Sequence, residues 1–231
     1  MKKALLILCA LALGLPLAGP ARADMSAVYG ALRLGPSLSA LSSITAHSQI
    51  GGDVSNQYDS RKTDTVFAGA VALGYRLDMP VRAEIEYTHR SRMDFDKKPT
   101  NNNLHDVDLK ARASTLLLNG YFDFYNDSQF TPYVLGGMGM AFHRTTNDVR
   151  SRGIAQDYEG DTKDYSRFAW ALGAGCGFHA SQRLTLDVLY RYVDLGKAKW
   201  SNTRVDGLDR GSLKGDLASH EIFFGLRYDL F

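Results

Sequence analysis

The chain has 231 residues, with 27 lysines and arginines against 25 aspartates and glutamates. Its first 23 residues account for the basic excess. A short basic start, an apolar run from Ala4 to Leu17, and the small-x-small sequence Ala21-Arg22-Ala23 together form the pattern of a secretory signal peptide. We therefore expect cleavage after residue 23 and a mature chain of residues 24–231. That chain would keep 24 basic and 25 acidic residues, because Lys2, Lys3 and Arg22 leave with the signal. This near-neutral balance argues against a nucleic acid partner.

The two cysteines are separated by the expected cleavage. Cys9 lies in the signal, so Cys176 remains alone and excludes a disulfide framework or a cysteine-rich metal site within one chain. After residue 23 no apolar stretch approaches the ~20 residues that a membrane-spanning helix needs. The remaining glycines and aromatic residues are typical of β-structure with many turns.

Apolar residues occupy every second position in eight segments, as they do in half-buried β-strands. The segments are, in chain order, 28–38, 66–76, 81–88, 107–124, 132–143, 168–179, 184–192 and 221–228. The clearest is the third, in which Val81, Ala83, Ile85 and Tyr87 alternate with Arg82, Glu84, Glu86 and Thr88. In the fourth the alternation changes phase near Ser114, which predicts a β-bulge there.

The separators between these segments alternate in length. Short ones lie at 77–80, 125–130 and 180–183, and long polar ones lie at 39–64, 91–106, 144–166 and 196–219. Short turns at one end and long loops at the other are typical of outer-membrane barrels. We predict an all-β fold, an eight-stranded antiparallel up-and-down transmembrane barrel that occupies residues 24–231 without a second domain. A soluble up-and-down barrel and a β-sandwich share the same period and stay as alternatives.

The charged face is expected to point into the barrel. Ala68, Ala70, Ala72 and Gly74 leave space on the strand beside the charged face of segment 81–88. The predicted interior charge network is Arg76, Arg82, Glu84, Glu86, Asp187, Arg191 and Arg227. Opposite charges should pair, because an isolated charge in a dry interior is costly. We expect Glu84 and Glu86 to pair with Arg191 and Arg227 and to block conduction. A narrow ion channel gated by such a salt bridge is the alternative.

The outward aromatic residues are expected to form the interfacial girdle of a membrane barrel. They are Tyr75, Tyr87, Phe122, Tyr133, Tyr190, Tyr192 and Tyr228.

Several fragments resemble the opacity-type, OmpA-like outer-membrane barrels. They are Gly74 to Tyr87, Leu118 to Phe124, Phe130 to Val134, Gly136 to Gly139, Tyr190 to Asp194, and His220 to Phe231. The resemblance implies an exported protein of the bacterial outer membrane with four surface loops. Its implied partners are outer-membrane lipids and lipopolysaccharide, and, during insertion, the barrel-assembly machinery and periplasmic chaperones. It also implies that Phe231 is the assembly signal, although Tyr228 lies three residues before the end, so that Leu230 and Phe231 break the alternation.

We find no compelling set of residues in the sequence that would converge to form a catalytic site. Glu84 and Glu86 are two apart on one strand, which a polar inner face produces without any substrate cleft. His179 and Ser181 lie at the periplasmic end, and the neighbours Ser219 and His220 should point to opposite faces. We predict no catalytic residues, no cofactor and no metal. An outer-leaflet enzyme that modifies lipid A is the alternative.

If the barrel is inert, recognition must come from the loops. Tyr58, Tyr158 and Trp200 are the candidate contact residues. The predicted function is non-enzymatic: envelope structure and surface contact, with adhesion to a host or envelope ligand as one form of that contact.

Overall fold

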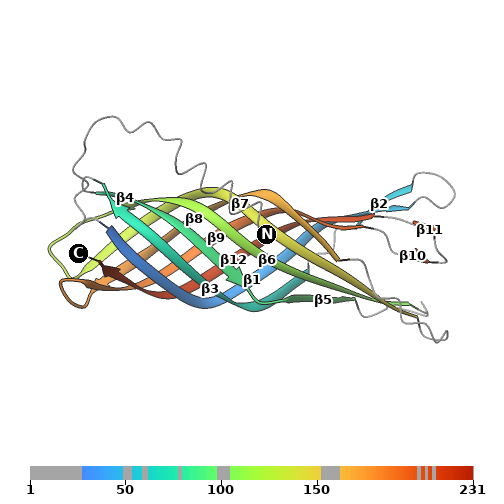
Figure 1. Ribbon diagram of the computed structural model, residues 1–231, viewed down its shortest axis with the longest axis horizontal. Coiled ribbons are helices and arrows are strands. Elements are labelled where there is room, and N and C mark those ends of the chain that lie inside the picture. The colour runs from blue at the N-terminus through green and yellow to red at the C-terminus, as the bar shows by residue number, and fades with distance from the viewer. Residues whose placement is uncertain are drawn as a thin grey trace.

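The computed structural model describes residues 28–48, 54–58, 62–77, 80–97, 105–151, 162–201, 204–205, 208–209 and 212–230. Eight long strands in it form the barrel wall (Figure 1): β1 (Val28–Ser48), β3 (Lys62–Arg76), β4 (Val81–Arg90), β6 (His105–Asp123), β7 (Phe130–Ser151), β8 (Thr162–His179), β9 (Leu184–Ser201) and β12 (Ser212–Asp229). Each pairs antiparallel with the next, and β12 pairs with β1 to close the barrel. The predicted eight-stranded barrel is confirmed.

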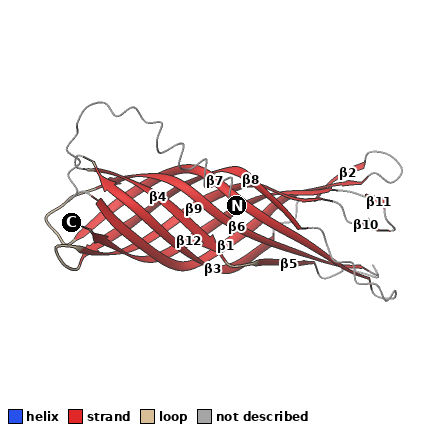
Figure 2. Ribbon diagram, in the orientation of Figure 1, coloured by secondary structure: helices blue, strands red, loops and turns tan. Residues whose placement is uncertain are grey.

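Four shorter strands extend one end of the barrel: β2 (Val54–Tyr58), β5 (Met93–Lys97), β10 (Arg204–Val205) and β11 (Leu208–Asp209). β2 pairs with β1 and β5 pairs with β6, while β10 and β11 form a separate two-stranded sheet. Figure 2 shows strands and connecting loops throughout the described part of the chain. Within it, no helix is long and apolar enough to cross a membrane.

The long strands reach far into the segments expected to be loops. β7 spans 22 residues and β1 spans 21, about twice the 9–11 residues that a tilted strand needs to cross a membrane. The apolar alternation ends at His143 in β7, but backbone pairing with β6 continues to Ser151. The alternation of apolar residues depends on one face of the strand being in contact with lipid, so it ends where that contact ends. The backbone hydrogen bonds between strands do not depend on lipid and continue further.

The predicted bulge at Ser114 is wrong. β6 pairs with β7 without a shift from His105↔Ser151 to Asp123↔Tyr133. What changes near Ser114 is the polarity of the two faces. Above it, Ala111 and Ala113 face inward and Arg112 faces outward, whereas below it Leu118 faces outward and Asn119 faces inward. The buried side chains toward the loop end are thus mainly apolar, whereas those toward the short turns include most of the buried charges.

Register shifts lie instead at Ser42/Thr45 of β1 and at Leu217/Ala218 of β12, near the loop end of the barrel seam. Ser43 and Gly196 both adopt positive φ angles, 53° and 76°. At Gly196 the backbone N–H donates to Oδ1 of Asp194 over 2.7 Å. Glycine suits this left-handed conformation because it has no Cβ atom.

Large apolar side chains form a belt around the outside of the barrel. Exposed members from successive strands include Leu34, Phe67, Val71, Leu73, Ile85, Leu118, Met138, Phe168, Leu172, Val188, Ile222, Phe224 and Leu226. Such a contiguous apolar surface has the chemistry of a lipid contact. The expected faces of the second and third segments are confirmed, since Phe67, Val71 and Leu73 point outward and Ala68 and Ala70 are buried.

Candidate functional site in the barrel lumen

A continuous chain of alternating acids and bases fills the membrane-level part of the lumen. In order it runs Asp123, Arg82, Glu84, Arg33, Glu86, Arg191, Glu221 and Arg90, each in contact with the next. Four carboxylates and four guanidinium groups give a formal charge of zero. The residues come from β1, β4, β6, β9 and β12, so the network connects walls that are distant in sequence. We refer to these eight residues as the lumen network.

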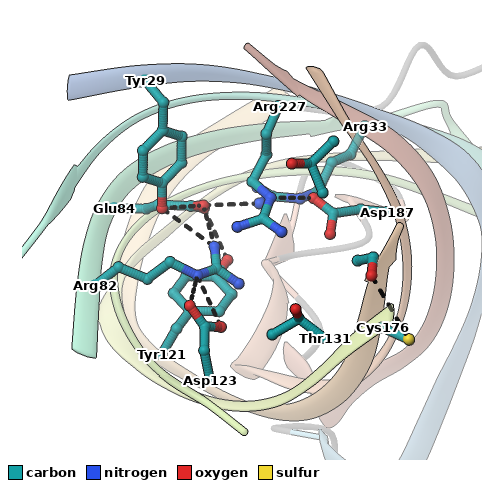
Figure 3. A network of polar contacts seen from close by, with 12 residues as sticks. Tyr29, Arg33, Arg82, Glu84, Tyr121, Asp123, Thr131, Cys176, Asp187 and Arg227 are labelled. Atoms are coloured by element: carbon teal, nitrogen blue, oxygen red, sulfur yellow. Dashed lines mark hydrogen bonds and ion pairs between the residues drawn. The ribbon is translucent and has the colours of Figure 1, made fainter. Parts of the chain in front are cut away.

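The part of the network nearest the short turns surrounds Arg82 (Figure 3). Its Nε lies 2.9 Å from Oδ2 of Asp123, and its Nη1 lies 3.1 Å from Oε1 of Glu84. The hydroxyl groups of Tyr29 and Tyr121 each donate to Glu84 over 2.8 Å. The Arg82 guanidinium carbon also lies 4.0 Å from the ring centroid of Tyr121, within cation–π range. Aromatic rings and carboxylates together therefore replace the water that Arg82 loses on burial.

Arg33 joins this part to the middle of the lumen. Its Nη2 donates to Glu84 over 2.9 Å and its Nη1 donates to Glu86 over 2.8 Å, so one guanidinium bridges two carboxylates. Glu86 accepts a second charged hydrogen bond from Arg191 and a third from the Thr88 hydroxyl. Glu84 and Glu86 would repel each other on neighbouring inward positions of β4, and the bridging arginine offsets that repulsion.

The outer part of the network is centred on Glu221. Its Oε1 accepts from Nε of Arg90 at 2.6 Å and from the Ser37 hydroxyl at 2.9 Å. Its Oε2 accepts from Nε of Arg191 at 2.7 Å. All of these side chains are essentially fully buried. A buried carboxylate with several charge-assisted bonds is stabilised only while every partner is present.

The predicted interior residues divide between the network and two separate pairs. Arg82, Glu84, Glu86 and Arg191 belong to the lumen network. Arg227 does not contact the glutamates as expected, and its Nε lies 2.8 Å from Oδ2 of Asp187. This is a close ion pair without hydrogen-bond geometry, since both atoms lack a hydrogen-bond partner. Glu84 pairs instead with Arg33 of β1 and with Arg82, two positions away on β4 itself.

Arg76 lies at the periplasmic rim. Its side chain is 29% exposed and pairs with Asp229 over 2.7 Å. In the neighbouring turn, the Tyr125 hydroxyl is 3.4 Å from Asp123. Partial burial and the Asp123 carboxylate raise the pKa of Tyr125. Arg76 therefore contributes to the rim and not to the buried chain of charges.

Sequence reasoning missed Arg33, Arg90, Asp123 and Glu221. The parity of the strands contained the signal for two of them: Arg33 alternates with the outward Leu32 and Leu34, and Glu221 shares the inward parity of Arg227. Arg90 and Asp123 lie at strand ends, where a sequence pattern cannot show whether a side chain is buried in the lumen or exposed at the rim.

Tyr133 was expected in the outer girdle, and this is wrong because its side chain is 1% exposed and lies in the lumen. Glycine on the neighbouring strand provides the space: a Cβ at Gly175 would lie 2.5 Å from the Tyr133 ring. The same relation holds between Gly74 and Tyr29, where a Cβ would lie 2.2 Å from the ring. The glycine-rich strands thus accommodate the aromatic side chains of the lumen. Tyr75, Tyr87, Phe122, Tyr190 and Tyr228 are exposed on the outside.

An apolar cap covers the network at the loop end. It consists of Leu41, Met93, Leu117, Leu195 and Leu217, each at most 1% exposed. These residues belong to one cluster of buried side chains, which also includes Val66, Val193 and several alanines. The charges of the lumen are therefore separated from the loop end by close-packed hydrocarbon.

The geometry does not assemble a nucleophile and base from the candidate serine and histidine residues. Ser219 is buried and its hydroxyl lies 2.8 Å from that of Ser39, whereas His220 contacts the exposed Tyr190 hydroxyl with its Nδ1. The two side chains occupy opposite faces of β12. His179 contacts the hydroxyls of Thr131 and Thr185 beside the short turn.

The expected loop contacts lie outside the described side chains. Tyr158, Phe231 and the signal segment 1–23 lie outside the described residues, while Tyr58 and Trp200 are placed by their backbones alone, in β2 and β9.

Comparison with known proteins now identifies the barrel. The model of the outer membrane protein β-barrel domain matches residues 7–228. The chain belongs to this family. It is an outer-membrane protein, as the sequence pattern predicted.

Two curated relatives and one solved structure illustrate the family. The chain is 30% identical over 178 residues to outer membrane protein PagN of Salmonella typhimurium, which covers 72% of this chain and 74% of the relative. It is 28% identical to a putative adhesin of Rickettsia conorii, over 73% of this chain and 70% of the relative. The structure of OprG from Pseudomonas aeruginosa matches with a TM-score of 0.53 at 18% identity, over 87% of this chain and 96% of that one. OprG thus shares the fold.

Proposed function

We propose that this outer-membrane barrel is a non-enzymatic surface-contact protein that binds host or envelope ligands through the loop end of its strands. The observation that carries the proposal is the filled lumen. The lumen network and the apolar cap occupy the interior with side chains that are almost completely buried. A barrel of this kind is a rigid scaffold, and the segments at its loop end then carry the function.

The strands that extend past the apolar belt support the same proposal. β5, β6 and β7 pair side by side beyond the membrane level, and β1 pairs with β2. These ribbons hold the loop ends away from the lipid surface, where a partner could reach them. Figure 1 shows the extension at the end of the barrel that carries β2 and β5. The similarity to a relative named as a putative adhesin supports adhesion as the form of this contact.

Adhesion would require exposed side chains at that end. Tyr58, Tyr158 and Trp200 are the proposed contact residues, since large aromatic groups supply much of the binding energy in protein interfaces. Delivery of the barrel would use periplasmic chaperones and the assembly machinery, with Phe231 as the recognised terminus.

Attachment of bacteria to cultured host cells tests the proposal. A laboratory strain without adhesins would express either the unmutated chain or a variant with Tyr58, Tyr158 and Trp200 changed to alanine. We expect the unmutated chain to increase attachment and the triple variant to lose most of that increase. The matched control is Tyr125→Ala, which removes an exposed tyrosine from the opposite, short-turn end.

Two further measurements separate the alternatives. Outer-membrane levels must be equal for all variants, judged by the unboiled band on a denaturing gel. Lipid A from expressing cells should keep its acyl composition in mass spectra. No gain in attachment upon expression would refute the contact role, and a changed acyl pattern that requires Ser219 or His220 would refute the non-enzymatic one.

A further inference from the structure

Two arginines face each other on the outside of the barrel, directly above the apolar belt. Arg112 of β6 and Arg144 of β7 are cross-strand partners in the antiparallel ladder. Both side chains are exposed, and both lie on the face that carries the belt lower down. Directly opposed residues in such a pair have Cβ atoms about 5 Å apart, and like charges at this distance repel each other.

The few nearby polar groups do not balance this pair. Asp164 of β8 lies 3.7 Å from Nε of Arg144, with both side chains more than 60% exposed. Among the side chains that the structure describes, none forms an ion pair or a hydrogen bond with Arg112. Ser114 follows Arg112 on the outward face, and its hydroxyl is hydrogen-bonded to Nδ1 of His89 over 3.0 Å. One carboxylate against two guanidinium groups leaves the cluster cationic.

The contrast with the lumen is informative. Inside, each arginine of the lumen network is matched by carboxylates within 3.1 Å. Outside, among the described side chains, Arg144 has one loosely placed carboxylate, Asp164 at 3.7 Å, and Arg112 has none. Guanidinium groups bind phosphate oxygens through two parallel N–H donors, and two such groups side by side match one phosphate group.

The level of the pair specifies the source of the phosphate. The next outward residue of β7 is Phe142, which pairs with Ser114 and Ser166 of the neighbouring strands, and below it lie Met140 and Met138. A ligand that contacts the arginines and this surface together needs an anionic head group, such as a phosphate, and hydrocarbon chains. The outer leaflet of the bacterial outer membrane is made of such a lipid.

We propose that Arg112 and Arg144 form a binding site for a phosphate group of lipid A, with the acyl chains packed along Leu116, Met140 and Phe142. Asp164 weakens the site, because its carboxylate competes with the phosphate for Arg144. The site lies on the barrel wall and is distinct from the loop contacts proposed above.

Native mass spectrometry of the full chain, folded in detergent micelles, tests the site. The probes are lipid A with two phosphates and the same lipid after dephosphorylation. We expect the phosphorylated form to bind more tightly to the unmutated chain. The double variant Arg112→Gln/Arg144→Gln should weaken that binding about tenfold or more, since two charge-assisted hydrogen-bonded contacts are lost. Arg183→Gln, in the exposed short turn at the other end, should leave it unchanged.

Asp164→Asn should tighten binding of the phosphorylated lipid. A misfolded variant would lose binding, so this result would not be explained by misfolding. Equal migration of the unboiled variants on a denaturing gel shows that the barrels are folded. Three results would overturn the proposal: unchanged affinity in the double variant, equal binding of the dephosphorylated lipid, or displacement of lipid A by excess inorganic phosphate, which would indicate a site for a free anion.

Discussion

Arg90 and Glu221 meet across the barrel lumen from β4 and β12, with Nε of the arginine 2.6 Å from Oε1 of the glutamate. The same carboxylate binds Arg191 through its other oxygen. One glutamate therefore holds two arginines that have lost their hydration. The predictions below follow from this arrangement and from the apolar surfaces around it.

Glu221→Gln should be strongly destabilising. The amide fits the same space but leaves Arg90 without a compensating charge and Arg191 with Glu86 alone, and breaking a buried ion pair typically costs about 3–5 kcal/mol. Urea unfolding of the barrel in lipid vesicles, followed by loss of the unboiled gel band, measures the change. Asp164→Asn is the control, because its ion pair is exposed and worth about 0–1 kcal/mol. Equal midpoints for the two variants would contradict the importance of the lumen network.

The unmutated barrel should form no stable pores in planar bilayers. Glu84→Ala should remain closed too, because the apolar cap lies above the site of the lost carboxylate. Opening should require both Glu84→Ala and removal of cap side chains, as in Leu41→Ala/Leu217→Ala. Stable large conductance in the unmutated chain would refute the closed lumen and favour the channel alternative.

Phe224→Arg should destabilise the barrel in lipid by about 2–4 kcal/mol, because Phe224 is 61% exposed within the apolar belt. Its cross-strand partners Leu34 and Val188 are exposed as well. Ser166→Arg, on the outward face above the belt, should change the stability by about 0–1 kcal/mol. In a soluble barrel the two variants would not differ in this way, since an added surface charge would be tolerated at Phe224 as well.

Gly139→Ala should cost about 1–3 kcal/mol, the usual range for overpacking. A Cβ there would lie 2.1 Å from the carbonyl oxygen of Leu116, which belongs to the backbone of β6 and cannot rotate away. Gly136→Ala is the matched control on the same strand, where the nearest atom is a Leu172 methyl group at 3.7 Å. Refolding yield and urea midpoint together measure the difference. Equal values for the two variants would show that the β6 and β7 backbones can move apart to accommodate the added methyl group.

The sequence was sufficient to predict the strand count, the closed barrel and most of the outward faces, because lipid on one side and a polar lumen on the other impose a strict alternation. It was misleading at Tyr133, which was assigned to the girdle because tyrosine suits either surface. Its parity is in fact opposite to that of the outward Val134 and Met138, and the neighbouring Gly175 leaves space for its ring inside the lumen. Most pair partners could not be predicted. Among the described residues five arginines are buried, Arg33, Arg82, Arg90, Arg191 and Arg227, and which of them Glu84 binds depends on barrel diameter and strand stagger.

The lumen network also bears on how the barrel closes. Arg33 lies on the first strand and Glu221 on the last, and each is connected to the rest through Glu86 and Arg191. Before the seam between β1 and β12 forms, these charges have no complete set of partners. If β1 and β12 paired with their register displaced by two residues, the apolar side chains would still face outward. Arginines in the lumen would nevertheless lose their carboxylate partners. The network therefore favours the native register of the β1–β12 seam, which the lipid-facing surface alone does not specify.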